Sequence, residues 1–197
     1  MINIYLIGHD NVPETAALLP DCAVIPFPIG SWDDELTPWP APSIAKGRAF
    51  TGNAEMTLKS LETAIQQYEK EHGIPEKRAI AGYSLAGLFS LWAMTRCSLF
   101  DRAASVSGSL WYDGWNEYLK ENGFKKQPER VWISVGDREK NTRNPRMKTV
   151  EDEAGKTAEW MREQGIGCRF EIMPGGHFDH VDERIRQACR YLSEKLT

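Results

Sequence analysis

The stretch AIAGYSLAGLFSLWA, residues 79–93, joins two apolar runs through a single polar residue, Ser84. The first run is short and built of small residues, which is typical of a strand buried on both faces of a parallel sheet. The second, over residues 85–95, has the length of a buried helix. A serine on such a tight strand-to-helix turn projects its hydroxyl above the sheet.

Small residues surround this serine. Gly82, Ala86 and Gly87 let the helix pass close to neighbouring backbone, although Ala86 stands where the usual G-x-S-x-G pattern has glycine. The Leu85 amide lies at the amino end of the predicted helix, where it can donate to an oxygen that gains negative charge. Taken alone, Ser84 fits a helix N-cap as well as a nucleophile. The choice between these two roles therefore depends on residues elsewhere in the chain.

Short apolar runs and longer helical patterns alternate along the chain, which predicts an α/β fold with helices on both faces of a mostly parallel sheet. We expect one three-layer, doubly wound domain over residues 1–197, with strand order 2-1-3-4-5-6 because the Ala-rich strand should be central. Residues 30–52 are expected to form a long surface loop, and 111–120 a loop with a short helix. The predicted strands are 2–7, 22–27, 78–82, 103–106, 130–135 and 168–173, and the main helices are 53–72, 85–95, 150–164 and 181–196.

Two later strands end in residues that complement a reactive serine. The strand 130–135 runs into Gly-Asp137-Arg-Glu139, and the strand 168–173 runs into Pro-Gly-Gly-His177. A nucleophilic serine needs a general base, and that base needs an orienting carboxylate. The chain order serine, acid, histidine, each after a strand, matches this requirement. We favour Glu139 as the acid because it reaches farther across, with Asp137 as the alternative.

Composition argues against several other classes. The 197 residues include 24 basic and 28 acidic ones, for a net charge of −4, so neither nucleic acid nor an anionic membrane is an expected partner. No apolar run is long enough for a membrane span, and no signal peptide is expected. Four separated cysteines without a CxxC pair predict reduced thiols and a cytoplasmic location. Metal-binding HxH or HExxH spacing and a GxGxxG turn are missing, so no metal or cofactor is expected.

Four segments resemble the putative-esterase branch of the α/β hydrolases, which contains the enterochelin-type siderophore esterases. They are GYSLAGLFSLWA (82–93), SVSGSLWYDGW (105–115), VWISVGDRE (131–139) and MPGGHFDH (173–180). The resemblance covers about two thirds of the chain, and residues 1–77 match only loosely. It implies Ser84 as nucleophile, Glu139 or Asp137 as acid and His177 as base.

The resemblance also places a second oxyanion donor in the loop after the first strand, near His9 or Asp10. Against this family the chain is short, so we expect a minimal member without a cap domain. Its site should be open and shallow, and walled mainly by residues 30–52.

Together these features predict a serine esterase that acts on a small ester through an acyl-enzyme. An acyltransferase with the same three residues and a non-catalytic ligand-binding member of the fold are the alternatives, and a homodimer is left open. Cationic candidates for holding a polyanionic iron chelate are too few to predict siderophore hydrolysis: Lys46, Arg48, Arg138, Lys140, Arg143 and Arg146. The expected substrate contacts are aromatic, although such residues also serve as ordinary core: Trp32, Trp39, Tyr83, Trp111 and Tyr112.

Overall fold

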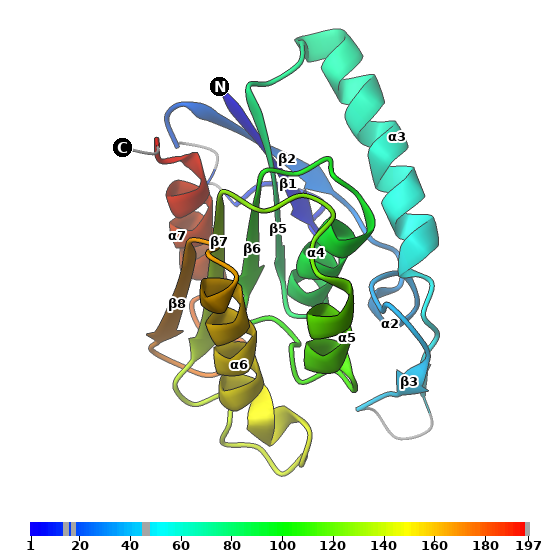
Figure 1. Ribbon diagram of the computed structural model, residues 1–197, viewed down its shortest axis with the longest axis vertical. Helices are drawn as coiled ribbons and strands as arrows, with labels where there is room; N and C mark the ends of the chain where they lie inside the picture. The colour runs from blue at the N-terminus through cyan, green and yellow to red at the C-terminus, as the bar shows by residue number, and fades with distance from the viewer. Residues whose placement is uncertain (14–15, 17–18, 45–47, 196–197) are drawn as a thin grey trace.

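A computed structural model describes residues 1–13, 16, 19–44 and 48–195 (Figure 1). Its main sheet has six parallel strands in the order β2-β1-β5-β6-β7-β8. When the six strands of this sheet are numbered by themselves along the chain, this is the predicted order 2-1-3-4-5-6. The strands β3 and β4 form a small separate sheet. The six strands are β1 (Ile2–Ile7), β2 (Cys22–Phe27), β5 (Lys77–Tyr83), β6 (Arg102–Val106), β7 (Arg130–Gly136) and β8 (Cys168–Met173).

The strand register brings all the carboxyl ends to one edge of the sheet. Ile7 pairs with Phe27 on one side and with Gly82 on the other, and Val106 pairs with Tyr83 and Ser134. Chain segments that follow β5, β6, β7 and β8 therefore emerge side by side. Ligands of open α/β sheets bind at this edge.

Helices cover both faces of the sheet, as predicted for a three-layer fold. On one face lie α3 (Ala54–His72), α4 (Leu85–Arg96), α5 (Trp115–Asn122) and α6 (Val150–Glu163). These four helices pack over one core cluster that includes Leu61, Phe89 and Leu119, and Figure 1 shows α4, α5 and α6 side by side in front of the strands. On the other face, α7 (Val181–Ser193) buries Ile185 and Leu192 against the sheet.

Residues 30–52 differ from the prediction of a surface loop. They contain a short helix, α2 (Trp32–Glu35), and an antiparallel pair, β3 (Ala41–Pro42) and β4 (Ala49–Phe50). Leu36 and Phe50, both buried, attach this segment to the core. A long-range bond from Thr57 Oγ1 to the Glu35 carbonyl, at 2.6 Å, ties it to α3. The tertiary contacts therefore give the segment structure that its Pro-rich composition does not predict.

Smaller differences concern element ends. A 3-10 turn (Met147–Thr149) precedes α6, and α7 ends at Ser193 where the pattern predicted a helix to residue 196, which lies outside the described residues. No helix in the described part of the chain has the length and apolar character needed to cross a membrane.

Candidate active site

Ser84 stands alone between the end of β5 and the start of α4. Its backbone has φ 57° and ψ −124°, a strained conformation for a residue with a side chain. A Cβ on Gly82 would lie 2.3 Å from the backbone of Ala86, and one on Gly87 would lie 2.8 Å from Ser105 Oγ. The small residues around Ser84 are therefore required by the sharp turn that presents its hydroxyl.

A continuous row of hydrogen bonds joins Ser84, His177 and Glu139. Ser84 Oγ lies 3.1 Å from His177 Nε2, and His177 Nδ1 lies 2.7 Å from Glu139 Oε2. These are hydrogen-bonding distances between a hydroxyl, an imidazole and a carboxylate. The structure thus brings together three of the residues that the sequence singled out.

Glu139 is buried, with a side chain only 3% exposed. Its other oxygen, Oε1, accepts hydrogen bonds from the Gly136 amide at 2.6 Å and from Arg184 Nη1 at 3.1 Å. Burial raises the pKa of Glu139, but hydrogen bonds from His177 and the Gly136 amide outweigh it and hold the pKa below its usual value. The carboxylate is therefore ionised and firmly oriented.

Asp137, the alternative acid, lies elsewhere. It is exposed, and its Oδ1 accepts a hydrogen bond from the Gly175 amide at 2.9 Å. Its own amide continues the ladder to the Met173 carbonyl, so its side chain supports the turn after β8. Of the two candidates, Glu139 is the one in contact with His177.

The turn that carries His177 is held from two sides. The carboxylate of Asp179 accepts a hydrogen bond from the Gly176 amide at 2.7 Å. The Tyr83 hydroxyl donates to the His177 carbonyl, and the two rings lie 4.9 Å apart. Burial raises the pKa of Tyr83, which keeps its hydroxyl a proton donor.

A pocket of about 330 Å³ opens beside Ser84. Three of the predicted aromatic contacts, Trp32, Tyr83 and Trp111, lie in its wall. The sequence did not predict several other lining residues. Among them, Ser109 could have been found from the sequence, because it belongs to the Ser-Gly-Ser stretch after β6. The full lining is Trp32, Asp33, Ile44, Phe50, Tyr83, Ser84, Leu85, Ser109, Trp111, Met147, His177 and Phe178.

Trp39 and Tyr112 are not among these lining residues. The Trp39 indole donates to the Asp113 carbonyl at 2.9 Å, and the Tyr112 hydroxyl donates to the Trp39 carbonyl at 2.6 Å. Their rings also pack against each other, 5.8 Å apart. The Tyr112 ring also packs against the ring of the lining residue Phe50, with the centroids 5.2 Å apart, so this pair supports the pocket wall.

Leu85, the first residue of α4, lines the pocket as an oxyanion donor should, but His9 and Asp10 are not among the described lining residues. The Trp32 ring packs against Gly8, within 2.6 Å of where a Cβ would stand. On this side of the pocket the wall is therefore the indole of Trp32, and the second oxyanion donor stays a prediction.

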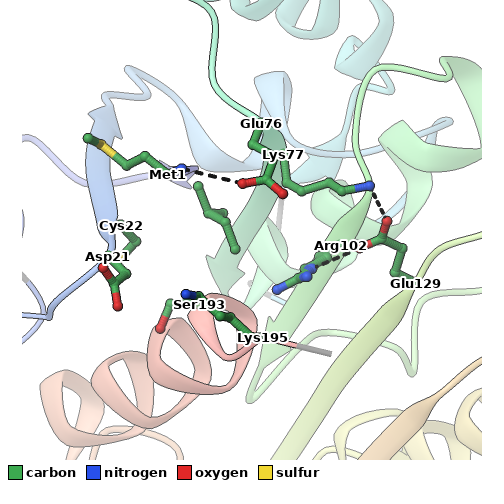
Figure 2. Close-up of a pocket in the computed structure, with 10 residues that line it drawn as sticks. Met1, Asp21, Cys22, Glu76, Lys77, Arg102, Glu129, Ser193 and Lys195 are labelled. Atoms are coloured by element: carbon green, nitrogen blue, oxygen red, sulfur yellow. Dashed lines mark hydrogen bonds and ion pairs between the residues drawn. The ribbon is translucent and has the colours of Figure 1, made fainter. Parts of the chain in front are cut away.

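A larger cavity of about 810 Å³ lies at the opposite edge, where β1, β5, β6 and β7 begin. Figure 2 shows three ion pairs at this cavity: the terminal amine with Glu76, and both Lys77 and Arg102 with Glu129. Asp21 and Lys195 also line this cavity, without an ion pair in the figure, and no histidine is among its described lining residues. Within the described residues, no group of three His, Cys, Asp or Glu side chains is arranged to hold a metal ion.

Comparison with known proteins identifies the family. The family model described as "Putative esterase" matches residues 16–180. A curated relative, the uncharacterized protein YbbA of Bacillus subtilis (strain 168), is 32% identical over 129 residues, which cover 61% of this chain and 51% of the relative. The chain thus spans about half the length of that relative.

Solved structures share the fold at low identity. An IroE-like serine hydrolase from Shewanella oneidensis superimposes with a TM-score of 0.81 at 16% identity, over 97% of this chain and 69% of that one. The siderophore hydrolase EstA from Aspergillus nidulans gives 0.73 at 18% identity, over 97% and 82%. With the family match over most of its length, this chain belongs to the putative esterase family and has an α/β-hydrolase-type fold.

Proposed function

We propose that this protein is a serine esterase that works through an acyl-enzyme, with Ser84 as nucleophile, His177 as general base and Glu139 as the orienting acid. The observation that carries the proposal is the unbroken hydrogen-bonded row from Ser84 Oγ to Glu139, beside a pocket at the carboxyl edge of the sheet. This arrangement meets the geometric requirements for an activated nucleophile.

The distances support a two-step reaction. His177 Nε2, 3.1 Å from Ser84 Oγ, takes the hydroxyl proton as the oxygen attacks the ester carbonyl, and then passes it to the departing alcohol. A water molecule then attacks the carbonyl of the acyl-enzyme, His177 takes the proton of the water and returns it to Ser84 Oγ, and the acid is released. The Leu85 amide is the proposed first oxyanion donor, with the loop at His9 and Asp10 proposed for the second.

The pocket favours a neutral ester with an apolar or aromatic group. Its walls are largely aromatic and aliphatic, none of the described lining residues is Lys or Arg, and Asp33 adds a negative charge. Several nearby cations are already paired: Arg138 with Asp179, Lys140 with Glu151 and Arg146 with Asp113. Arg48 and Arg143 are exposed and line no part of the pocket, and Lys46 lies outside the described residues. A polyanionic iron chelate is therefore a poor match, although structural neighbours are siderophore hydrolases.

Ser84→Ala is the direct test. A fluorophosphonate probe should label the wild-type protein at Ser84, and the variant should neither label nor hydrolyse p-nitrophenyl acetate. Ser109→Ala is the matched control, because Ser109 Oγ lies 3.4 Å from Ser84 Oγ in the same pocket but forms no hydrogen bond with His177. A folded wild-type protein that takes no label, or labelling that survives in Ser84→Ala, contradicts the proposal.

The same residues would also transfer the acyl group to an alcohol. Hydrolysis in the presence of added alcohols, with both products quantified, separates an esterase from an acyltransferase. A non-catalytic ligand-binding role is disfavoured by the intact row of hydrogen bonds. The single domain, the cytoplasmic location, the homodimer and the expected lack of nucleic-acid or membrane partners stay predictions.

A further inference from the structure

Arg184 is a fully buried arginine behind the candidate site, with a side chain 0% exposed. Nη1 donates to Glu139 Oε1 at 3.1 Å and to Ser107 Oγ at 2.8 Å, and Nη2 donates to the Pro174 carbonyl at 2.8 Å. Ser107, Glu139 and Pro174 follow β6, β7 and β8. One guanidinium therefore connects the ends of three neighbouring strands.

Among the described residues that α7 buries, Arg184 is the one that is charged. The other buried residues of α7 are Ile185, Ala188, Cys189 and Leu192, all apolar. Burying a guanidinium is costly unless it is paired, and apolar side chains often stabilise such positions equally well. A role in packing alone therefore does not account for the arginine.

We propose that Arg184 is a positioning residue for the esterase reaction, which anchors Glu139 Oε1 and keeps the carboxylate charged so that Oε2 stays bonded to His177. The inference rests on the proposed function. Arg184 reaches no substrate, because it is buried behind Glu139, so it acts only through that carboxylate. The bond to Ser107, held at a strained φ of 47°, fixes the guanidinium in turn.

Other titratable or charged groups surround the pair and bear on its pH response. Tyr83 faces it from β5, and Asp137, Arg138 and Asp179 lie on the loops after β7 and β8. Arg138 and Asp179 pair with each other at 2.9 Å, at the surface. Arg184 is therefore the buried cation bonded directly to Glu139, and its removal should make the carboxylate easier to protonate.

Arg184→Met tests this, with Arg102→Met as the matched control. Arg102 is also buried and bonded, to Glu129 and to the Leu192 and Glu194 carbonyls at the far end of α7, away from the site. In Arg184→Met, kcat should fall about 10- to 100-fold, less than the roughly 10²- to 10⁴-fold that a general base contributes, because His177 itself stays in place; KM should change less than about twofold. The acidic limb of the pH profile should move up by about one pH unit.

Arg184→Lys should restore the acidic limb, because it keeps the charge, and Arg102→Met should keep the wild-type profile. If Arg184→Met fails to fold, Ser107→Ala removes one anchor of the guanidinium and should move the limb in the same direction by a smaller amount. Unchanged profiles in Arg184→Met or Ser107→Ala, or an equal shift in Arg102→Met, overturn the inference. A wild-type protein that takes no fluorophosphonate instead refutes the esterase proposal itself.

Discussion

Replacing Glu139 with glutamine probes the innermost member of the hydrogen-bonded row. Oε2 accepts from His177 Nδ1 at 2.7 Å, whereas Oε1 accepts from the Gly136 amide at 2.6 Å and from Arg184 Nη1 at 3.1 Å. Glutamine keeps the shape but turns one oxygen into a donor. If that NH₂ faces Gly136 and Arg184, it meets two donors. If it faces His177, the imidazole can accept by carrying its proton on Nε2 instead.

The second orientation is therefore favoured, and it disables the base. A proton on His177 Nε2 points at Ser84 Oγ, 3.1 Å away, so the nitrogen cannot take the serine proton. In serine proteases the same carboxylate-to-amide change lowers kcat about 10⁴-fold, which corresponds to about 5.4 kcal/mol of transition-state stabilisation. We expect a similar loss of kcat, with KM nearly unchanged. Leaving Arg184 buried without its anion should also lower the free energy of unfolding by about 3–5 kcal/mol.

The assay measures kcat and KM on p-nitrophenyl acetate, below the melting temperature of the variant and with its fold verified by circular dichroism. Asp137→Asn is the control. Asp137 is exposed and accepts one hydrogen bond, from the Gly175 amide. The kcat of this variant should therefore stay within about threefold of the wild-type value, because exposed substitutions usually change free energies by about 0.5 kcal/mol or less. A folded Glu139→Gln enzyme that keeps more than about a tenth of wild-type kcat, or an equal loss in Asp137→Asn, refutes the assignment.

Three further outcomes follow from the same contacts. Asp33→Asn should raise kcat/KM for a negatively charged ester relative to its neutral analogue, because Asp33 adds a negative charge to the pocket wall; an unchanged ratio would place the substrate elsewhere. Gly82→Ala should lower the free energy of unfolding by about 1–3 kcal/mol in urea titrations, since its Cβ would stand 2.3 Å from the Ala86 backbone and the turn would have to shift to make room. The pKa of Glu139 is lower in the folded protein than its usual 4.5, so its contribution to stability is complete above about pH 4.5 and is lost as pH falls through the folded-state value. Urea midpoints measured across that range should therefore drop more steeply for wild type than for Glu139→Gln.

Most of the helices and strands are predictable because each depends on a local apolar pattern. The six strands follow short apolar runs, most of which end next to Gly or Pro, and the structure extends them by no more than a residue or two. Residues 30–52 are the exception. Their short helix and strand pair depend on burial of Leu36 and Phe50 and on the bond from Thr57, a residue of a different helix. Contacts of this kind leave no periodic signal.

Ser84 and His177 are recognisable in the chain because Ser84 directly follows a strand and His177 ends the short Pro-Gly-Gly turn after another, and parallel strands bring such residues to one edge. The choice between Glu139 and Asp137 was not, because two residues of separation decide whether a carboxylate points to the imidazole or to the Gly175 amide. Arg184 gave no signal either. It stands among charged neighbours on α7, and only the packing of that helix against the sheet buries it.

The amino-acid order alone is enough to define an α/β sheet with a serine, an acid and a histidine placed in turn at its carboxyl edge, because strand periodicity and tight Gly-rich turns are local properties. Which carboxylate meets the histidine, which arginine supports it and which side chains wall the pocket are settled in three dimensions. Ser84 and His177 are 93 positions apart, and Glu139 and Arg184 are 45 apart. Such contacts exist only after strand register and helix packing have brought their segments together.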